Sequence, residues 1–414
     1  LLIHFNISNL CIGLLKSVDL NFIRWIDKAF GPVIAQFLFV AGLLLGRFRK
    51  HETSFQLETV KKILLIKFFG GGSILLASPI IHKIKEVHPN ATISIITLSE
   101  NKEICSLISA IDKIYCLDIK TFFSFLFNYL SLIRGIKNKN YNIVVDLEFV
   151  TNFSALTTLL VSILSKPLFT IGFSSPSKWR NKVYSIAIPF DHSRHITGIF
   201  KKLFSPLINK SFEIDFEVPK RDLISAAEFS SVATSILEVN SDAKKIVCVN
   251  INAGKICHLR RWPQESYAEL IHGLFDRFGV KTVLIGGSDD ISYVDEFVKK
   301  LSNKIDLSNL CGKLSIKELI GLFSKSRLLI TNDSGPLHIA NIVSLPTVSF
   351  FGPETPYLYG PLGPKNQVFY EDIFCSPCIN IYNSKKSDCR DNICLKNIKP
   401  QTVIQAIEAK KFLP

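Results

Sequence analysis

Acidic residues are scarce in this chain relative to basic ones. Against 49 lysines and arginines stand 35 aspartates and glutamates, which leaves a formal net charge of +14. Such an excess favours an anionic partner: a phosphate, a nucleic acid or an acidic lipid surface. Nothing in the sequence resembles a zinc finger or a basic zipper helix, which argues against a nucleic-acid-binding module. A membrane surface and a phosphorylated substrate therefore remain as the predicted partners.

Glycine-rich nucleotide signatures are missing too. Neither G-x-G-x-x-G nor a P-loop follows the first predicted strand, and this disfavours a nicotinamide-dependent oxidoreductase. Methionine is absent altogether, and the residues offer no physical reason for it.

What the chain has instead is hydrophobic sequence, at 47% of residues. Ala29–Gly46 contains one strongly polar residue, Gln36. As a helix this segment would be about 27 Å long, close to the hydrocarbon core of a bilayer. The basic residues that follow it (Arg47, Arg49 and Lys50) place the downstream side in the cytoplasm. We expect a membrane-embedded segment and then a polar linker over 51–59; a core helix or an interfacial helix is the alternative.

The first globular domain opens with a predicted buried strand, Lys61–Phe68, and a helix, Ile74–Val87. Between them lie Gly70, Gly71, Gly72 and Ser73. A strand, a glycine turn and a helix form a geometry that can hold phosphate. The alternative is a tight turn without a ligand.

Alternation of strands and helices continues. Further strands are predicted at Thr92–Thr97, Ile114–Leu117, Asn142–Leu147 and Phe169–Phe173. Phe122–Ile133 is apolar nearly all round and too short to span a membrane, so we expect a core helix, with lipid contact as the alternative. Arg134, Lys137 and Lys139 follow it and would suit a membrane surface.

Two carboxylates, Asp146 and Glu148, stand at the end of one of these strands. A general base belongs at that edge of a parallel sheet, although capping of the next helix is the alternative. The basic segment Ser175–Ser185 is predicted to be a loop facing the acceptor or the membrane. His192 and His195 are predicted to mark the start of a surface helix, with phosphate binding as the alternative.

A second α/β domain is predicted to begin near Lys244, with the strand Lys245–Asn252 and the helix Gln264–Phe278. The loop between them carries four basic side chains: Lys255, His258, Arg260 and Arg261. Cations after the carboxyl end of a strand form a plausible pyrophosphate clamp, since arginine offers bidentate contacts.

The stretch from Arg327 to Pro353 is the most informative. It predicts a buried strand (Arg327–Thr331), a polar turn (NDSGP, 332–336), a helix and another strand (Thr347–Phe351). Asp333 or Ser334 would cap the helix, and Gly335 and Pro336 would suit its first turn. The helix N-terminus favours an anion, above all phosphate. Together the two sets of βα repeats predict two Rossmann-like domains facing each other across a cleft.

Several ordered motifs resemble glycosyltransferase family 9, which includes the lipopolysaccharide heptosyltransferases. These motifs are RRWP (260–263), LIGG (284–287), LCGKLSIKEL (310–319), NDSGPLHIA (332–340) and FFGPETPYLYGPLGP (350–364). The resemblance covers about residues 60–400. It implies a GT-B fold, an inverting mechanism, a nucleotide-diphosphate sugar as donor, a glycolipid or lipopolysaccharide-core acceptor, and no metal cofactor. The sequence also lacks a convincing D-x-D metal motif.

The residue pattern and the resemblance together predict a division into four parts. These are a membrane-associated segment and linker (1–58), an acceptor-side domain (59–240), a nucleotide-sugar-binding domain with a Cys-rich tail (241–400) and a C-terminal helix (401–414). With the basic residues that follow the apolar segment, the resemblance predicts catalytic domains on the cytoplasmic face of the inner membrane.

Roles for residues on the donor side also follow from the resemblance. Asp333 would lie beside the donor sugar or ribose, while the N–H groups of Ser334 and Gly335 would hold the pyrophosphate. Arg260, or alternatively Arg261, would stabilise the departing nucleoside diphosphate. Asp289 or Asp290 would contact the nucleotide.

One position departs from the family pattern. Heptosyltransferases carry an aspartate in the first βα loop, taken as the general base, where this chain has Ser73. A serine hydroxyl cannot accept the acceptor's proton unaided at neutral pH. We expect Glu148, or secondarily Asp146, to replace it. The alternative is a non-catalytic relative that binds sugar nucleotides or acts as a scaffold.

The C-terminal cysteines have the spacing C-x2-C-x10-C-x4-C: Cys375, Cys378, Cys389 and Cys394. That spacing could hold a structural zinc ion. Reduced thiols that stabilise a loop are the preferred interpretation, because a cytoplasmic location disfavours disulfides.

Overall fold

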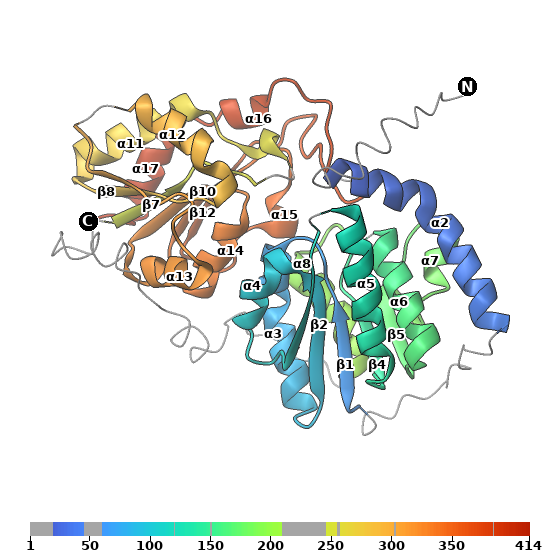
Figure 1. Ribbon diagram of the computed structural model, residues 1–414. Coiled ribbons are helices and arrows are strands. Elements are labelled where there is room, and N and C mark those ends of the chain that lie inside the picture. The colour runs from blue at the N-terminus through green and yellow to red at the C-terminus, as the bar shows by residue number, and fades with distance from the viewer. Residues whose placement is uncertain are drawn as a thin grey trace, which may run out of the picture. The chain divides into compact units, whose positions relative to one another are not determined.

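The computed structural model describes residues 20–44, 60–119, 121–149, 151–208, 246–254, 257–301, 304–383 and 385–414. The chain divides into two compact units: unit 1 comprises Leu1–Asp191 and Thr197–Ile214, and unit 2 comprises His192–Ile196 and Asp215–Pro414. Each unit contains one six-stranded parallel sheet (Figure 1). The predicted linker at 51–59 and the predicted boundary near 240 lie outside the described residues.

The sheet of unit 1 has the order β3-β2-β1-β4-β5-β6. Its strands are β1 (Lys62–Ile66), β2 (Thr92–Leu98), β3 (Lys113–Leu117), β4 (Ile143–Asp146), β5 (Phe169–Phe173) and β6 (Ile186–Ile188). Runs such as KILLI form strands here because helices cover both faces and every residue after the first is buried. The strand order reverses between β1 and β4, whose backbones pair directly. Open α/β sheets bind ligands beside such a reversal.

The helices of unit 1 are α2 (Leu20–Leu44), α3 (Gly71–Val87), α4 (Lys102–Ser106), α5 (Phe122–Lys137), α6 (Asn152–Ser165) and α7 (Lys178–Asn181), with α8 (Ile196–Phe204) crossing the boundary between the units. Short 3-10 turns occur at η2 (Ser99–Asn101) and η3 (Ser205–Leu207). Figure 1 shows α5, α6 and α2 side by side, and α6 contacts both of the others.

The prediction that Phe122–Ile133 lies in the core is only half right. Tyr129, Ile133 and Ile136 of α5 pack into the core, but Phe123 and Phe127 are 60% and 74% exposed. The sequence is apolar on both faces of this helix, so its pattern does not reveal which face is buried.

The hydrophobic stretch Ala29–Gly46 lies largely within α2, as a helix should, but its role as a membrane span is not confirmed. Throughout the part of the chain that the structure describes, every helix is too short or too polar to cross a bilayer. One face of α2 instead packs on α6.

The sheet of unit 2 has the order β12-β11-β10-β7-β8-β9. Its strands are β7 (Ile246–Asn250), β8 (Lys281–Leu284), β9 (Leu307–Asn309), β10 (Leu328–Asn332), β11 (Thr347–Phe351) and β12 (Asn366–Tyr370). Its strand order reverses between β7 and β10, which pair with each other. The polar turn NDSGP therefore lies at this reversal.

The helices of unit 2 are α11 (Gln264–Phe278), α12 (Ile291–Lys299), α13 (Ile316–Lys325), α14 (Gly335–Ile342), α15 (Pro356–Tyr359), α16 (Ile393–Lys396) and α17 (Pro400–Ala409), with 3-10 turns η5 (His258–Arg260) and η6 (Ser288–Asp290). The predicted C-terminal helix is α17, and it packs against α11. Trp262 anchors the core: it is fully buried, stacks on Phe350 with ring centroids 4.3 Å apart, and donates its indole N–H to the Ile398 carbonyl at 3.1 Å.

Candidate active site

Glu148 lies at the strand reversal of unit 1, just after β4, and is only 3% exposed. Its Oε1 accepts hydrogen bonds from the backbone N–H groups of Phe68 and Phe69, each at 2.7 Å. Its Oε2 accepts one from Lys67 Nζ at 3.1 Å. Both oxygens therefore hold the loop between β1 and α3 in place. A general base needs an oxygen that faces the acceptor, and this arrangement gives Glu148 a positioning role first.

Asp146 is fully buried. Its Oδ1 accepts the Glu148 N–H at 2.9 Å, and its Oδ2 accepts the Tyr184 hydroxyl at 2.6 Å. Burial raises the pKa of Asp146 to about 6, although the nearby Arg180 guanidinium opposes that rise. Without access to solvent, this carboxyl group supports the structure around the β4 end.

The segment Ser175–Ser185 is predicted to be a basic loop facing the acceptor or the membrane, and for Arg180 this prediction is wrong. Arg180 lies on α7, is fully buried, and donates to the Thr151 carbonyl at 2.8 Å and to the Tyr184 hydroxyl at 3.1 Å. It is the counter-charge for Asp146. An arginine flanked by lysines gives no sequence signal that distinguishes it as buried.

Asp27 is a residue that sequence reasoning missed, because it precedes the stretch interpreted as a membrane segment. Its Oδ2 accepts the N–H of Asn152, the first residue of α6, at 2.9 Å. Burial raises the pKa of Asp27. This bond fixes α2 to the N-terminus of α6.

The glycine turn of unit 1 is tightly packed. Gly70 has φ +80°, a left-handed conformation that favours glycine. A Cβ at Gly71 would lie 2.4 Å from Ile104 Cδ1, and Gly72 forms the first turn of α3. The Ser73 hydroxyl donates to the Gly70 carbonyl at 2.7 Å. These contacts explain the glycines at 70 and 71 without a ligand, and Ser73 closes the turn.

At the reversal of unit 2, polar side chains converge from β7 and β10. Asn250 Nδ2 donates to Ser334 Oγ at 2.9 Å and to Thr331 Oγ at 3.0 Å. Asn332 Oδ1 accepts the backbone N–H of Trp262 at 2.9 Å, and Asn332 Nδ2 donates to the Ile251 carbonyl at 3.0 Å. This buried network holds the NDSGP turn rigidly against the ends of both strands.

Ser334 stands at the N-cap position of α14, but its side chain makes no capping hydrogen bond. The predicted capping is wrong because the hydroxyl donates to the Asn332 carbonyl at 3.1 Å instead. Gly335 and Pro336 occupy the first turn, as predicted. A Cβ built on Gly335 would meet nothing within 4 Å. Open space therefore lies before an uncapped helix N-terminus, which is the arrangement that accommodates an anion.

Arg260 and Asp333 form the charged pair of this site. Arg260 Nη1 lies 3.0 Å from Asp333 Oδ2, and Nη2 donates to the Ala253 carbonyl at 2.7 Å. Two fixed bonds orient the guanidinium plane, and it keeps further N–H groups for another partner. Asp333, assigned by resemblance to the donor sugar, here holds Arg260 in position.

Arg261 is arranged differently. Its guanidinium lies over the Tyr293 ring, 3.9 Å from the centroid, and 3.6 Å from Asp290 Oδ1. Asp289 is exposed on η6, and Asp290 accepts the Gly287 N–H at 3.2 Å. The structure thus brings Asp290 to Arg261 of the loop. Lys255 lies outside the described residues.

His338 belongs to the NDSGPLHIA motif, but its sequence position alone indicates no role for it. It is buried on α14, and burial lowers its pKa to about 4, with Asp333, His195 and Arg260 as its titratable neighbours. At neutral pH it is therefore an uncharged imidazole beside the Arg260–Asp333 pair. His195 immediately precedes α8, as predicted, and its Nε2 lies 3.0 Å from the Gly360 carbonyl.

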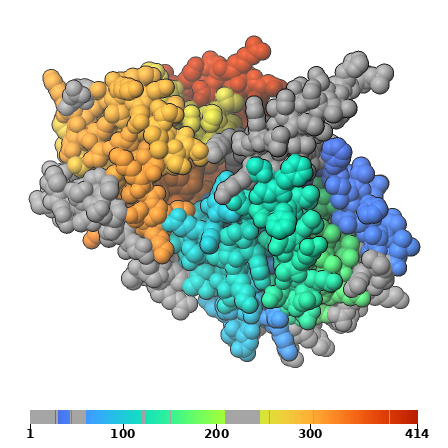
Figure 2. All heavy atoms as spheres, viewed as in Figure 1, coloured from blue at the N-terminus to red at the C-terminus, as the bar shows by residue number. Residues whose placement is uncertain are grey.

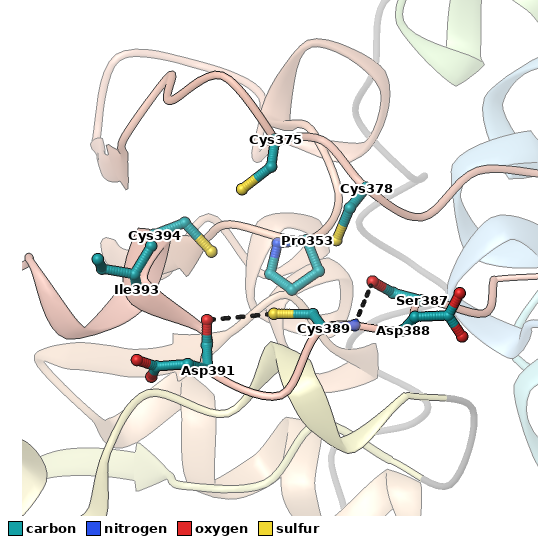
Figure 3. Close-up of a pocket in the computed structure, with 9 residues that line it drawn as sticks. All are labelled: Pro353, Cys375, Cys378, Ser387, Asp388, Cys389, Asp391, Ile393 and Cys394. Carbon is teal, nitrogen blue, oxygen red and sulfur yellow. Dashed lines mark hydrogen bonds between the residues drawn. The ribbon is translucent and has the colours of Figure 1, made fainter.

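The four C-terminal cysteines line one cavity of about 260 Å³ (Figure 3). Burial raises the pKa of Cys378, and it raises that of Cys394 to about 11. Within the described ranges, no three His, Cys, Asp or Glu side chains are grouped so as to hold a metal ion. The structure therefore gives the zinc alternative no support.

Comparison with known proteins gives a consistent result. The model of glycosyltransferase family 9 (heptosyltransferase) matches residues 129–387. Lipopolysaccharide heptosyltransferase 1 of Campylobacter coli is 22% identical over 84% of this chain and 98% of its own length. Lipopolysaccharide heptosyltransferase 3 of Escherichia coli is 27% identical over 68% of this chain and 79% of its own.

Among solved structures, the Escherichia coli ADP-heptose LPS heptosyltransferase II has a similar fold. Its TM-score is 0.63 at 18% identity, over 84% of this chain and 98% of that one. At this identity the likeness concerns the fold, two parallel α/β units of the GT-B kind.

Proposed function

Since the chain belongs to glycosyltransferase family 9 and is a glycosyltransferase, we propose that it transfers a heptose-like sugar from an ADP-sugar to the core of lipopolysaccharide or a related glycolipid. The Arg260–Asp333 pair, beside the open N-terminus of α14, carries this proposal. It lies at the strand reversal, where such sheets bind nucleotides.

In the proposed mechanism the donor's diphosphate binds at the N-terminus of α14. The backbone N–H groups there and the helix dipole attract its negative charge. As the bond to the sugar breaks, charge grows on the departing diphosphate, and Arg260 stabilises it. Asp333 and the Ala253 carbonyl hold the guanidinium in place beforehand, so little reorganisation is needed during reaction.

Inversion at the sugar carbon and independence of metal ions are part of the proposal and rest on family membership. The acceptor hydroxyl must lose a proton, and Glu148 is the proposed base. We further propose that the reaction occurs at the cytoplasmic face of the inner membrane, because the relatives act on lipopolysaccharide.

A second candidate function is binding of sugar nucleotides without turnover. It is favoured by one observation: Ser73 replaces the acid of the first loop, and three donors occupy both oxygens of Glu148. The donor-binding residues of unit 2 would then be intact, whereas unit 1 would lack a working general base.

Release of nucleoside diphosphate distinguishes the two. Purified protein is incubated with ADP-heptose, GDP-sugars or UDP-sugars, with and without a lipopolysaccharide-core acceptor. The proposed enzyme releases ADP only when the acceptor is present. Saturable donor binding without acceptor-dependent release would favour the non-catalytic relative.

A further inference from the structure

Helix α2 has one buried face and one exposed face. On the buried side, Leu38 and Phe39 pack against the cluster formed by Ala155, Leu159 and Ile163 of α6. The backbones approach closely, since a Cβ on Gly31 would lie 2.7 Å from Asn152 Cβ. Two hydrogen bonds from Asn152 to Asp27 fix the start of this contact. The helix is therefore docked on unit 1 in a defined rotation, which determines which side chains face outward.

The outward face of α2 is mostly apolar, with Gln36 as an exposed polar side chain on it. The exposed large apolar side chains follow one another at one to four residues, as a stripe along the helix: Phe30, Val33, Ile34, Phe37, Val40 and Leu44. Phe37 is 74% exposed and Leu44 is 82% exposed. Soluble surfaces carry scattered apolar residues, but a stripe over four turns of one helix indicates a binding surface.

Helix α5 carries a second stripe of the same kind. Phe123, Leu126, Phe127 and Leu130 are exposed at positions i, i+3, i+4 and i+7. Continuing at the same spacing, Arg134 and Lys137 lie in the last turn, and both are exposed. The same helical face thus passes from aromatic to cationic along its length.

The two helices flank α6, which contacts both (Figure 1). Figure 2 shows α2 in blue and α5 in blue-green at the surface of unit 1. The four exposed phenylalanines alone present on the order of 500 Å² of apolar surface, taking about 200 Å² for each side chain. A typical monomer's largest apolar patch is about 300–600 Å² in total.

From these faces we propose that the α2–α5 surface (the two stripes with Arg134 and Lys137) docks onto an anionic phospholipid bilayer. Aromatic and aliphatic side chains enter the boundary between headgroups and acyl chains, as in interfacial helices. The cations at the end of α5 pair with lipid phosphates, and the net charge of +14 attracts the whole protein to such a surface. A protein partner would not require cations in line with the apolar stripe, whereas an anionic lipid surface does.

Vesicle flotation tests this proposal without any nucleotide sugar. The full chain is mixed with vesicles of phosphatidylcholine alone or with 30% phosphatidylglycerol, and the bound fraction is measured against lipid concentration and salt. We expect binding to the anionic vesicles that weakens with salt. Phe37→Ser combined with Phe127→Ser should lower the partition coefficient at least tenfold. Arg134→Gln with Lys137→Gln should lower it about fivefold per cation, and only on anionic vesicles.

Matched controls come from unit 2. Arg277→Gln with Lys325→Gln removes two exposed cations that also lie in the last turns of helices. Tyr357→Ser removes an aromatic side chain that is 69% exposed. These variants should float like the wild type, and circular dichroism verifies the fold of each.

Equal flotation of the phenylalanine variant and the wild type would overturn the proposal. The proposal would also be overturned if the wild type formed a dimer in solution without vesicles and the phenylalanine variant did not. A second copy of the chain would then cover the α2–α5 surface. Transfer to a delipidated core oligosaccharide should be unaffected by the α2–α5 variants. Loss of flotation and loss of the proposed glycosyl transfer are therefore separate outcomes.

Discussion

Replacing Arg260 is the sharpest test of the donor site. Its guanidinium is fixed by Asp333 Oδ2 at 3.0 Å and by the Ala253 carbonyl at 2.7 Å, and it retains N–H groups for the diphosphate. Two charge-assisted hydrogen bonds contribute about 1.5–3 kcal/mol each, but only the part that grows as the sugar departs affects kcat. Loss of one preorganised donor to a developing anion costs about 2.7–4 kcal/mol, or about 10²–10³ in kcat.

We therefore expect Arg260→Gln to lower kcat about 10²–10³-fold. Arg260→Lys should fall between this variant and the wild type, because an ammonium group cannot keep both fixed bonds and also bind phosphate bidentately. The assay is acceptor-dependent ADP release under saturating donor. Arg277→Gln, in the last turn of α11 where Arg277 pairs with Glu408 of α17, is the matched control. The reasoning would be refuted if Arg260→Gln kept a kcat within threefold of the wild type while Arg261→Gln lost most of it. Arg261 would then be the residue that stabilises the departing diphosphate.

Three further predictions concern other parts of both units. Glu148→Gln should lower turnover at least a hundredfold and the free energy of unfolding by about 3–5 kcal/mol, because a buried lysine loses its counter-charge; full turnover would exclude the base role. Trp262→Ala should cost about 3–5 kcal/mol in chemical denaturation, through the cavity and the lost bond to Ile398, and a loss below 1 kcal/mol would show that the core closes around the gap. Burial lowers the pKa of His338 to about 4 in the folded state, against 6.5 in the unfolded chain. Because the unfolded chain binds the proton more tightly, the free energy of unfolding falls by up to about 3 kcal/mol between pH 6.5 and pH 4. His338→Gln should remove that decline. The measurement is the difference in free energy of unfolding between wild type and variant at each pH, because the raised pKa of Asp146 changes stability in the opposite direction over a similar pH range. Identical pH profiles for the two proteins would contradict the prediction.

Much of the fold follows from local sequence pattern. The strand Phe169–Phe173 and the helix Gln264–Phe278 have the predicted bounds, because turn residues interrupt a clear apolar run in one and a 3.6-residue period in the other. The strand orders of the two sheets were not predicted from pattern. They depend on long-range pairing, such as β1 with β4, that local sequence does not encode.

The site residues could be predicted where basic side chains or a polar turn directly follow a predicted buried strand. Arg260 and NDSGP were identified because cations and a polar turn each follow a buried strand. Partner choice was not predictable: Arg260 pairs with Asp333, and the Ser334 hydroxyl joins a network instead of capping its helix. Both outcomes depend on side-chain geometry in three dimensions.

Burial of charge was the least predictable feature. Arg180 and Glu148 are almost completely enclosed, although the segment around Arg180 is basic and reads as solvent-exposed. Conversely, apolar faces of α2 and α5 are exposed although their sequences resemble core or membrane helices. Composition reports what a segment contains, while burial depends on which neighbours cover it.

The central claim is that the strand reversal of unit 2 binds the donor's diphosphate. A crystal structure with ADP bound tests it most directly. The account predicts phosphate oxygens within about 3.2 Å of backbone N–H groups at Ser334 or Gly335 and of the Arg260 guanidinium. A diphosphate bound away from the N-terminus of α14, with Arg260 still paired only to Asp333 and Ala253, would contradict it.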